Sequence, residues 1–148
     1  MGQVIIMVGV PGSGKSTYVK NSNPNAPILS ADNFFMKRGV YQFDRNYLGT
    51  AHASCYNGFL ALIEAKQEVI VIDNTNTTLR EIEKYANPAK EADYEVKIVV
   101  LKCDCLTAFN RNVHNVPLAS IQKMAERIEN TCKTLMDGKY ECEIEIKE

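Results

Sequence analysis

Blocks of hydrophobic residues, separated by polar ones, divide this chain into strand-length and helix-length segments in turn. Four short runs are almost wholly apolar, as expected for strands buried on both faces: 4–8, 28–30, 69–72 and 96–101. Helices are predicted over 15–21, 45–65, from 78 to the residue before Pro88, and 121–135. This alternation predicts an α/β fold in which a mainly parallel sheet lies between layers of helices.

The last segment of the chain has a different pattern. Residues 141–146 alternate between acidic and other side chains at period two, which predicts an edge strand with one solvated, acidic face. Gly138 is expected to cap the preceding helix. The edge strand could pair within the chain or with a second copy, so the oligomeric state stays open.

The first predicted strand leads directly into a glycine-rich stretch that matches G-x-x-x-x-G-K-[ST] without a gap. This pattern is typical of a loop whose backbone N–H groups, with the start of the next helix, hold nucleotide phosphates. Lys15 would reach the outer phosphates, and the Ser16 hydroxyl would hold Mg²⁺. The expected fold is therefore a three-layer P-loop NTPase, and its nucleotide-binding residues are Gly9, Gly12, Ser13, Gly14, Lys15, Ser16 and Thr17.

Length and composition place few further limits on the protein. With 148 residues, 45% hydrophobic and 24% charged, the chain fits a single domain over 1–148. No apolar run reaches membrane-spanning length and no signal-peptide pattern is present, so we expect no membrane contact and a cytoplasmic location. The five cysteines are odd in number and lack metal-site spacing, so they are expected to be reduced and mostly buried.

The net charge of −1 conceals an asymmetry between two parts of the chain. Residues 1–60 carry five Lys or Arg and two Asp or Glu, which gives +3, whereas the remainder carries twelve against sixteen, which gives −4. The part with the phosphate loop is therefore the positive one. This favours an anionic ligand there, although the charge is small beside that of proteins that grip long duplexes.

Two carboxylates come directly after predicted strands, where parallel sheets bind their ligands. Asp73 follows the third strand, and we expect it beside Ser16 and its Mg²⁺; the alternative is that it caps a helix. Asp32 follows the second strand and is the candidate general base for an incoming hydroxyl; its alternative is again a helix cap, near Asn33.

A lid over the phosphates is predicted after the fourth strand. Arg111 lies in a loop-like stretch that ends at Val116-Pro117, and a guanidinium there could stabilise the charge of the transferring phosphoryl group. Tyr41 and Phe43 could offer a stacking surface for a base, and packing of the loop is the alternative.

The order of these motifs resembles the AAA-like P-loop kinase domains related to phage polynucleotide 5′-hydroxyl kinase. The kinase-like domain of cyclic-nucleotide 3′-phosphodiesterases is a further relative. The resemblance covers nearly the whole chain up to about residue 129, and its matching stretches are 9–17, 30–32, 41–44, 51–52, 70–76 and 111–127.

This resemblance implies transfer of the γ-phosphate of ATP, with Mg²⁺, to a 5′-hydroxyl of RNA or DNA. Lys15 and Ser16 would bind the triphosphate and the metal, Asp32 would be the general base, and Arg111 would be the lid arginine. Two features depart from the phage pattern. Phe35 replaces an arginine that grips the acceptor's 3′-phosphate, and the lid is shorter, with one arginine before Val-Pro instead of two.

We therefore expect an ATP-dependent kinase whose acceptor is the 5′-hydroxyl of a polynucleotide. A small-metabolite or nucleoside kinase, and a nucleotide-binding module without transfer activity, are the alternatives. The choice between ATP and GTP, and between RNA and DNA, stays open.

Overall fold

The computed structural model describes residues 2–112, 114–137 and 142–147. It contains a five-stranded parallel sheet in the order β2-β5-β1-β6-β7. The strands are Gln3–Val8 (β1), Ile28–Leu29 (β2), Val69–Asp73 (β5), Glu95–Leu101 (β6) and Glu143–Lys147 (β7). The predicted α/β fold with a parallel sheet is confirmed. β1, which leads into the phosphate loop, is the central strand.

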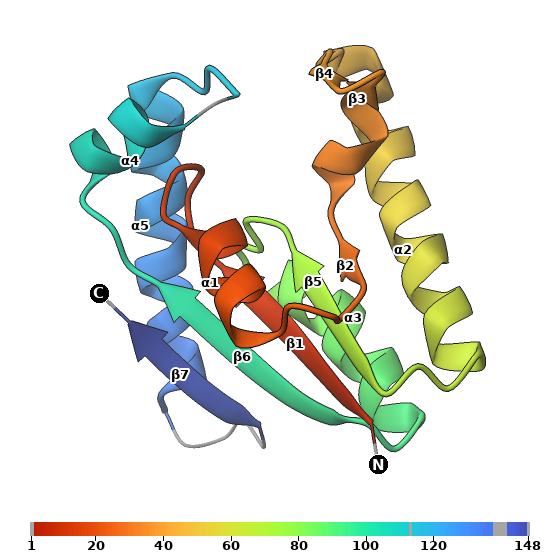
Figure 1. Cartoon of the computed structure of the whole chain (residues 1–148). Helices are drawn as coiled ribbons and strands as arrows, with labels where there is room; N and C mark the ends of the chain where they lie inside the picture. Colours follow the sequence, from red (N-terminus) through yellow and green to blue (C-terminus); the bar gives the residue numbers. More distant parts are fainter. Residues whose placement is uncertain (1, 113, 138–141, 148) are drawn as a thin grey trace.

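The helices cover the two faces of this sheet unequally (Figure 1). On one face, alternate β1 residues such as Val4 and Ile6 join a large core with three helices, and on the other face Ile5 and Met7 meet little more than Val19 of one short helix. The large core is built with Leu48–Glu64 (α2), Leu79–Glu91 (α3) and Leu118–Leu135 (α5), and the short helix is Lys15–Ser22 (α1). Both faces are buried along β1, which explains its unbroken apolar sequence.

Several short elements gather at the carboxyl ends of the strands. The 3-10 helix Ala31–Phe35 (η1) follows β2 and is followed by the β3–β4 hairpin (Met36–Lys37 and Val40–Tyr41) and the 3-10 helix Arg45–Tyr47 (η2). Helix α4 (Cys105–Arg111) follows β6. Figure 1 shows that α4, the hairpin and the loop leading into α1 lie at the same end of the sheet. The sequence pattern missed α4 and the hairpin.

The third helix is longer than predicted. The sequence predicted that it ends before Pro88, but α3 continues through Pro88 to Glu91. Proline removes one helical hydrogen bond, but this turn also buries Tyr85, Ala86 and Ala89, and their burial offsets that loss. Thr78 begins the helix as predicted, and its side chain accepts a hydrogen bond from the Glu81 backbone N–H at 3.2 Å.

The predicted edge strand is confirmed as β7, which pairs within the chain, parallel to β6. The prediction that its acidic face is solvated is only partly right, because Glu145 has partners within the protein. The Tyr18 hydroxyl donates a 2.6 Å hydrogen bond to Glu145, and Lys97 lies 3.5 Å from the same carboxylate. Gly138, the predicted helix cap, lies outside the described residues.

The five cysteines are free thiols, as predicted, but only two of them are buried and three are partly exposed. Within the described residues, no group of His, Cys, Asp and Glu side chains has the arrangement of a metal site, and no helix is long and apolar enough to cross a membrane.

Candidate active site

The phosphate loop has the conformation that its glycines predict. Gly12 and Gly14 have φ angles of +83° and +96°, a region that favours glycine. Gly14 is the N-cap of α1 and supplies no side-chain hydrogen bond, so no side chain caps the first turn of the helix. Unpaired N–H groups at a helix start form an anion-binding site. The loop therefore presents a backbone cradle at the carboxyl end of β1.

Lys15 lies folded over this loop. Its ammonium donates hydrogen bonds to the backbone carbonyls of Gly9, at 2.9 Å, and Val10, at 3.0 Å. Burial lowers the pKa of Lys15, whereas the negative charges of Asp73 and Asp32 act to raise it. Both predicted carboxylates are thus close enough to Lys15 to act on its charge, although Asp73 ends β5 and Asp32 lies in η1.

Asp73 meets Ser16 as predicted. The Ser16 hydroxyl donates to Asp73 Oδ2 at 2.9 Å, across 57 positions of sequence. The alternative, that Asp73 caps a helix, is wrong because Thr78 caps α3. A hydroxyl and a carboxylate are hard oxygen ligands, and Mg²⁺ is commonly bound by one or two such groups together with substrate phosphates. These two residues therefore fit an Mg²⁺ ion shared with a nucleotide.

The three residues after Asp73 join the parts of the site. The Asn74 side-chain oxygen accepts from the Ala31 backbone N–H at 2.8 Å and so holds the start of η1. The Thr75 carbonyl accepts from the Gly9 N–H at 3.1 Å. The buried Asn76 side chain donates to the Met7 carbonyl at 2.8 Å. The sequence marked this stretch as a motif but did not reveal that it connects η1, the phosphate loop and β1.

Asp32 lies in η1 with its carboxylate free of any capping role. The cap is Ser30, whose hydroxyl accepts from the Asp32 N–H at 3.2 Å, so the helix-cap alternative for Asp32 is wrong. The Tyr41 hydroxyl donates to Asp32 Oδ1 at 3.2 Å. Burial, together with the Asp32 charge, raises the pKa of Tyr41 to about 12, so this hydroxyl keeps its proton at neutral pH. The Asp32 side chain is 53% exposed and accessible to a substrate.

Phe35, which stands where the phage pattern has an arginine, is an anchor for this loop. It is 2% exposed and packs with Ala31, Ala51 and Tyr41. Its ring also meets that of Phe43 at a centroid distance of 5.0 Å. The phosphate-gripping role of that position in the phage pattern is therefore absent here, because a buried aromatic ring fills it.

Arg111 was predicted to lie in an irregular loop, but it is the last residue of α4. Asp104 caps this helix by accepting from the Thr107 N–H at 3.1 Å, a signal that the sequence contains. The guanidinium is exposed and has no hydrogen bond or ion pair with the described residues. The α4 backbone itself lies against the phosphate loop, because a Cβ on Gly12 would come within 2.9 Å of the Ala108 carbonyl carbon.

Of the predicted site residues, the structure brings Lys15, Ser16, Asp73 and Asp32 together and leaves Arg111 exposed, with no hydrogen bond or ion pair to them. It adds Tyr41, through its hydroxyl, and His114, whose Nε2 is 3.9 Å from Asp32 Oδ2. The Tyr41 and Phe43 rings stack on each other at an interplanar angle of 13°, and both pack on Phe35. These contacts are the packing of the loop that was the alternative to a stacking surface for a base.

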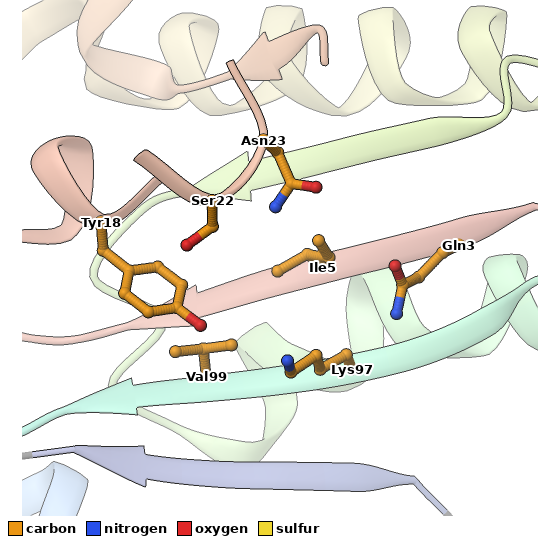
Figure 2. A pocket seen from close by; sticks show the side chains of 7 residues that line it. All are labelled: Gln3, Ile5, Tyr18, Ser22, Asn23, Lys97 and Val99. Carbon is orange, nitrogen blue, oxygen red and sulfur yellow. The ribbon is translucent and has the colours of Figure 1, made fainter. Parts of the chain in front are cut away.

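A separate cavity of about 300 Å³ lies over β1 and β6, on the face of the sheet with α1 (Figure 2). Its strand residues come from the amino-terminal part of β1 and from β6, and no residue of the phosphate loop contributes to it. It is therefore distinct from the nucleotide site. Its lining residues are Gln3, Ile5, Tyr18, Ser22, Asn23, Lys97 and Val99.

Comparison with known proteins agrees with this geometry. Residues 4–131 match the family described as AAA domain. Human NEDD4-binding protein 2 is 35% identical over an alignment of 132 residues, and the match covers 83% of this chain and 7% of that protein. A protein of Acanthamoeba polyphaga mimivirus, named "Putative bifunctional polynucleotide phosphatase/kinase", is 29% identical over 116 residues, which are 77% of this chain and 24% of that protein.

Among solved structures, a chain of the Pnkp1/Rnl/Hen1 RNA repair complex has the same fold. Its TM-score is 0.72 at 22% identity, and the match covers 90% of this chain and 46% of that one. The chain thus corresponds to less than half of each of these relatives. The phosphate loop and the parallel sheet agree with these matches. Because the family model matches most of the chain, the chain belongs to the AAA domain family, as a P-loop kinase-like domain related to polynucleotide kinases.

Proposed function

We propose that this chain is an ATP-dependent kinase that transfers the γ-phosphate to a hydroxyl group, namely the 5′-hydroxyl of a polynucleotide. The observation that carries the proposal is the position of Asp32. Its carboxylate is half-exposed and close enough to Lys15 to raise the pKa of that residue. Asp73, which accepts a hydrogen bond from Ser16, acts on Lys15 in the same direction. An ionised carboxylate beside a triphosphate costs free energy, because the two negative charges repel each other. The role of proton acceptor for an incoming hydroxyl gives a reason for a carboxylate at this position.

The residues then divide the work of phosphoryl transfer. Lys15 exchanges its two backbone carbonyl partners for phosphate oxygens, which are stronger acceptors because they are charged. Ser16 and Asp73 would hold Mg²⁺, which would neutralise charge on the phosphates. Asp32 takes the proton of the acceptor hydroxyl. The acceptor oxygen bonds to the γ-phosphorus, the bond from that phosphorus to the bridging oxygen breaks, and ADP leaves with the electron pair.

The segment from η1 to the start of α2 supports a nucleic-acid acceptor. Phe34, Phe43 and Tyr47 are 37%, 51% and 53% exposed, although aromatic rings usually pack away from water. Three cationic residues, Lys37, Arg38 and Arg45, lie within the same segment. Exposed rings interspersed with positive charge are typical of surfaces that stack single-stranded bases and track their phosphates. Tyr41, from the same segment, donates directly to Asp32.

The test is transfer of label from γ-labelled ATP, with Mg²⁺, to a panel of acceptors. The panel contains 5′-hydroxyl RNA and DNA oligonucleotides, nucleosides and, as a blank, oligonucleotides that already carry a 5′-phosphate. We expect label only on 5′-hydroxyl oligonucleotides. Transfer to nucleosides alone would favour the nucleoside kinase, and ATP binding without transfer to any acceptor would favour a binding module.

Two variants assign the roles. Lys15→Ala should lose both transfer and ATP binding by calorimetry, because it removes the cation at the phosphates. Asp32→Asn should lose transfer but keep ATP binding, because it removes only the proton acceptor. Asp93→Asn, at an exposed aspartate in the turn before β6, is the matched control and should behave as the wild type. Full activity of Asp32→Asn would remove the base from this mechanism.

A further inference from the structure

The connection between α4 and α5 places a histidine against the proposed base. The His114 ring meets the Tyr41 ring edge-on, with a centroid distance of 4.0 Å and an angle of 66°. Its Nε2 lies 3.9 Å from Asp32 Oδ2, and Tyr41 donates to the other oxygen of the same carboxylate. Two side chains from separate elements thus flank the two oxygens of Asp32.

The other ring nitrogen of His114 is an unusual feature. Nδ1 is buried and has no hydrogen-bond partner among the described residues. A buried nitrogen without a partner costs about 1–3 kcal/mol, so native structures rarely keep one without a reason. Such a nitrogen can be kept because a bound molecule completes its hydrogen bonds. The His114 ring that carries it lies beside Asp32, the carboxylate proposed to face the acceptor.

Asn112 joins the end of α4 to Val116, on the two sides of His114. The Asn112 side chain donates to the Phe109 carbonyl at 3.0 Å and accepts from the Val116 N–H at 3.0 Å, so it closes the turn from both sides. The same segment meets the phosphate loop, where Gly12 lies against Ala108. A single stretch of chain therefore contacts the phosphate cradle at one point and the Asp32 carboxylate at another.

We propose that His114 is a positioning residue for Asp32. Through His114, the packing of α4 on the phosphate loop affects how the Asp32 carboxylate is aligned. This proposal rests on the function proposed above. The present 3.9 Å separation is longer than a hydrogen bond. A movement of about 1 Å brings Nε2 within hydrogen-bond distance of Oδ2. With Tyr41 on Oδ1, the carboxylate is then held from both sides, with a lone pair left for the acceptor hydroxyl.

The kinetic test separates the nitrogen from the ring. His114→Phe keeps an aromatic ring against Tyr41 but has no nitrogen, whereas His114→Gln can still donate a hydrogen bond. We expect His114→Phe to lower kcat about 10- to 100-fold, the range expected for a hydrogen bond to a charged group. The KM for ATP and the thermal midpoint should stay near those of the wild type, and His114→Gln should regain most of the lost kcat. Equal kcat in His114→Phe and the wild type, or no recovery in His114→Gln, would overturn the proposal.

A second readout does not depend on activity. The chain has only two histidines, so the imidazole ¹⁵N signals of His114 are identified as those missing from His114→Phe. At fixed pH, Asp32→Asn should shift the His114 signals and leave those of His52, which makes no ion pair with Asp32, in place. No shift would overturn the contact itself. A chain that transfers phosphate to no acceptor overturns the function proposed above, while the nitrogen signals still report the contact.

Discussion

Substitution of Gly12 by alanine tests whether α4 is seated on the phosphate loop. A Cβ at this position would lie 2.9 Å from the Ala108 carbonyl carbon and 3.0 Å from the Asn112 nitrogen, and closer still to the Ala108 oxygen. Ordinary contact begins at 3.4 Å, so the end of α4 must withdraw by at least 0.5 Å. These neighbours are backbone atoms, which cannot rotate away as a side chain can.

Two costs add at this position. A side chain at φ +83° costs about 1–2 kcal/mol for the left-handed backbone, and forced repacking costs about 1–3 kcal/mol more. We therefore expect Gly12→Ala to lower the free energy of unfolding by about 2–5 kcal/mol. Gly39→Ala is the matched control, because Gly39 has φ +78° but nothing within 4 Å of the added Cβ. Its free energy of unfolding should fall only by the cost of the left-handed backbone, about 1–2 kcal/mol.

Urea unfolding of the two variants, followed by circular dichroism, measures this difference. Calorimetry with ATP should also show weaker binding to Gly12→Ala than to Gly39→Ala, because the clash distorts the cradle. If the two variants unfold at the same urea concentration, α4 does not pack on the phosphate loop. The coupling proposed through His114 would then lose its structural basis.

Three further substitutions test other parts of the structure. Asn76→Ala should cost about 2 kcal/mol in urea unfolding, because it leaves the buried Met7 carbonyl without its donor; a loss below about 0.5 kcal/mol would contradict this. The hydrogen bond from Tyr18 lowers the pKa of Glu145, so this bond stabilises the fold above the ordinary carboxyl pKa of 4.5, and the effect is lost as pH falls through the lowered value. Tyr18→Phe should therefore cost about 1 kcal/mol at pH 7 and progressively less in acid, and a cost independent of pH would refute the pairing. Phe43→Ala should raise the acceptor KM about 5- to 100-fold with no change in ATP binding, as expected for one lost stacking contact; an unchanged acceptor KM would exclude stacking on this ring.

Much of the nucleotide site could be predicted from sequence because local chain geometry determines it. The glycines of the phosphate loop, Lys15 and Ser16 lie within a few positions of one another, behind a strand that is recognisable by its apolar run. The position of Asp73 followed from a general property of parallel sheets, whose carboxyl ends meet at one edge. In both cases a short sequence pattern is enough to fix the relative positions of the residues.

The sequence alone also determined the class of fold. Continuous apolar runs separated by helical periodicity permit few arrangements other than a parallel sheet between helices. It did not determine how evenly helices cover the two faces, because that depends on where α2, α3 and α5 pack. Nor did it determine that α3 passes through Pro88, because burial of the surrounding turn outweighs the local cost of proline.

The surroundings of Asp32 were decided by tertiary structure. Ser30 took the capping role, Tyr41 came from a hairpin whose two strands have only two residues each, and His114 came from 82 positions further along the chain. Such contacts depend on loops brought together by the sheet, and no periodicity or short motif encodes them. Local sequence determined where phosphates would bind, and only the folded chain determined what surrounds the carboxylate across from them.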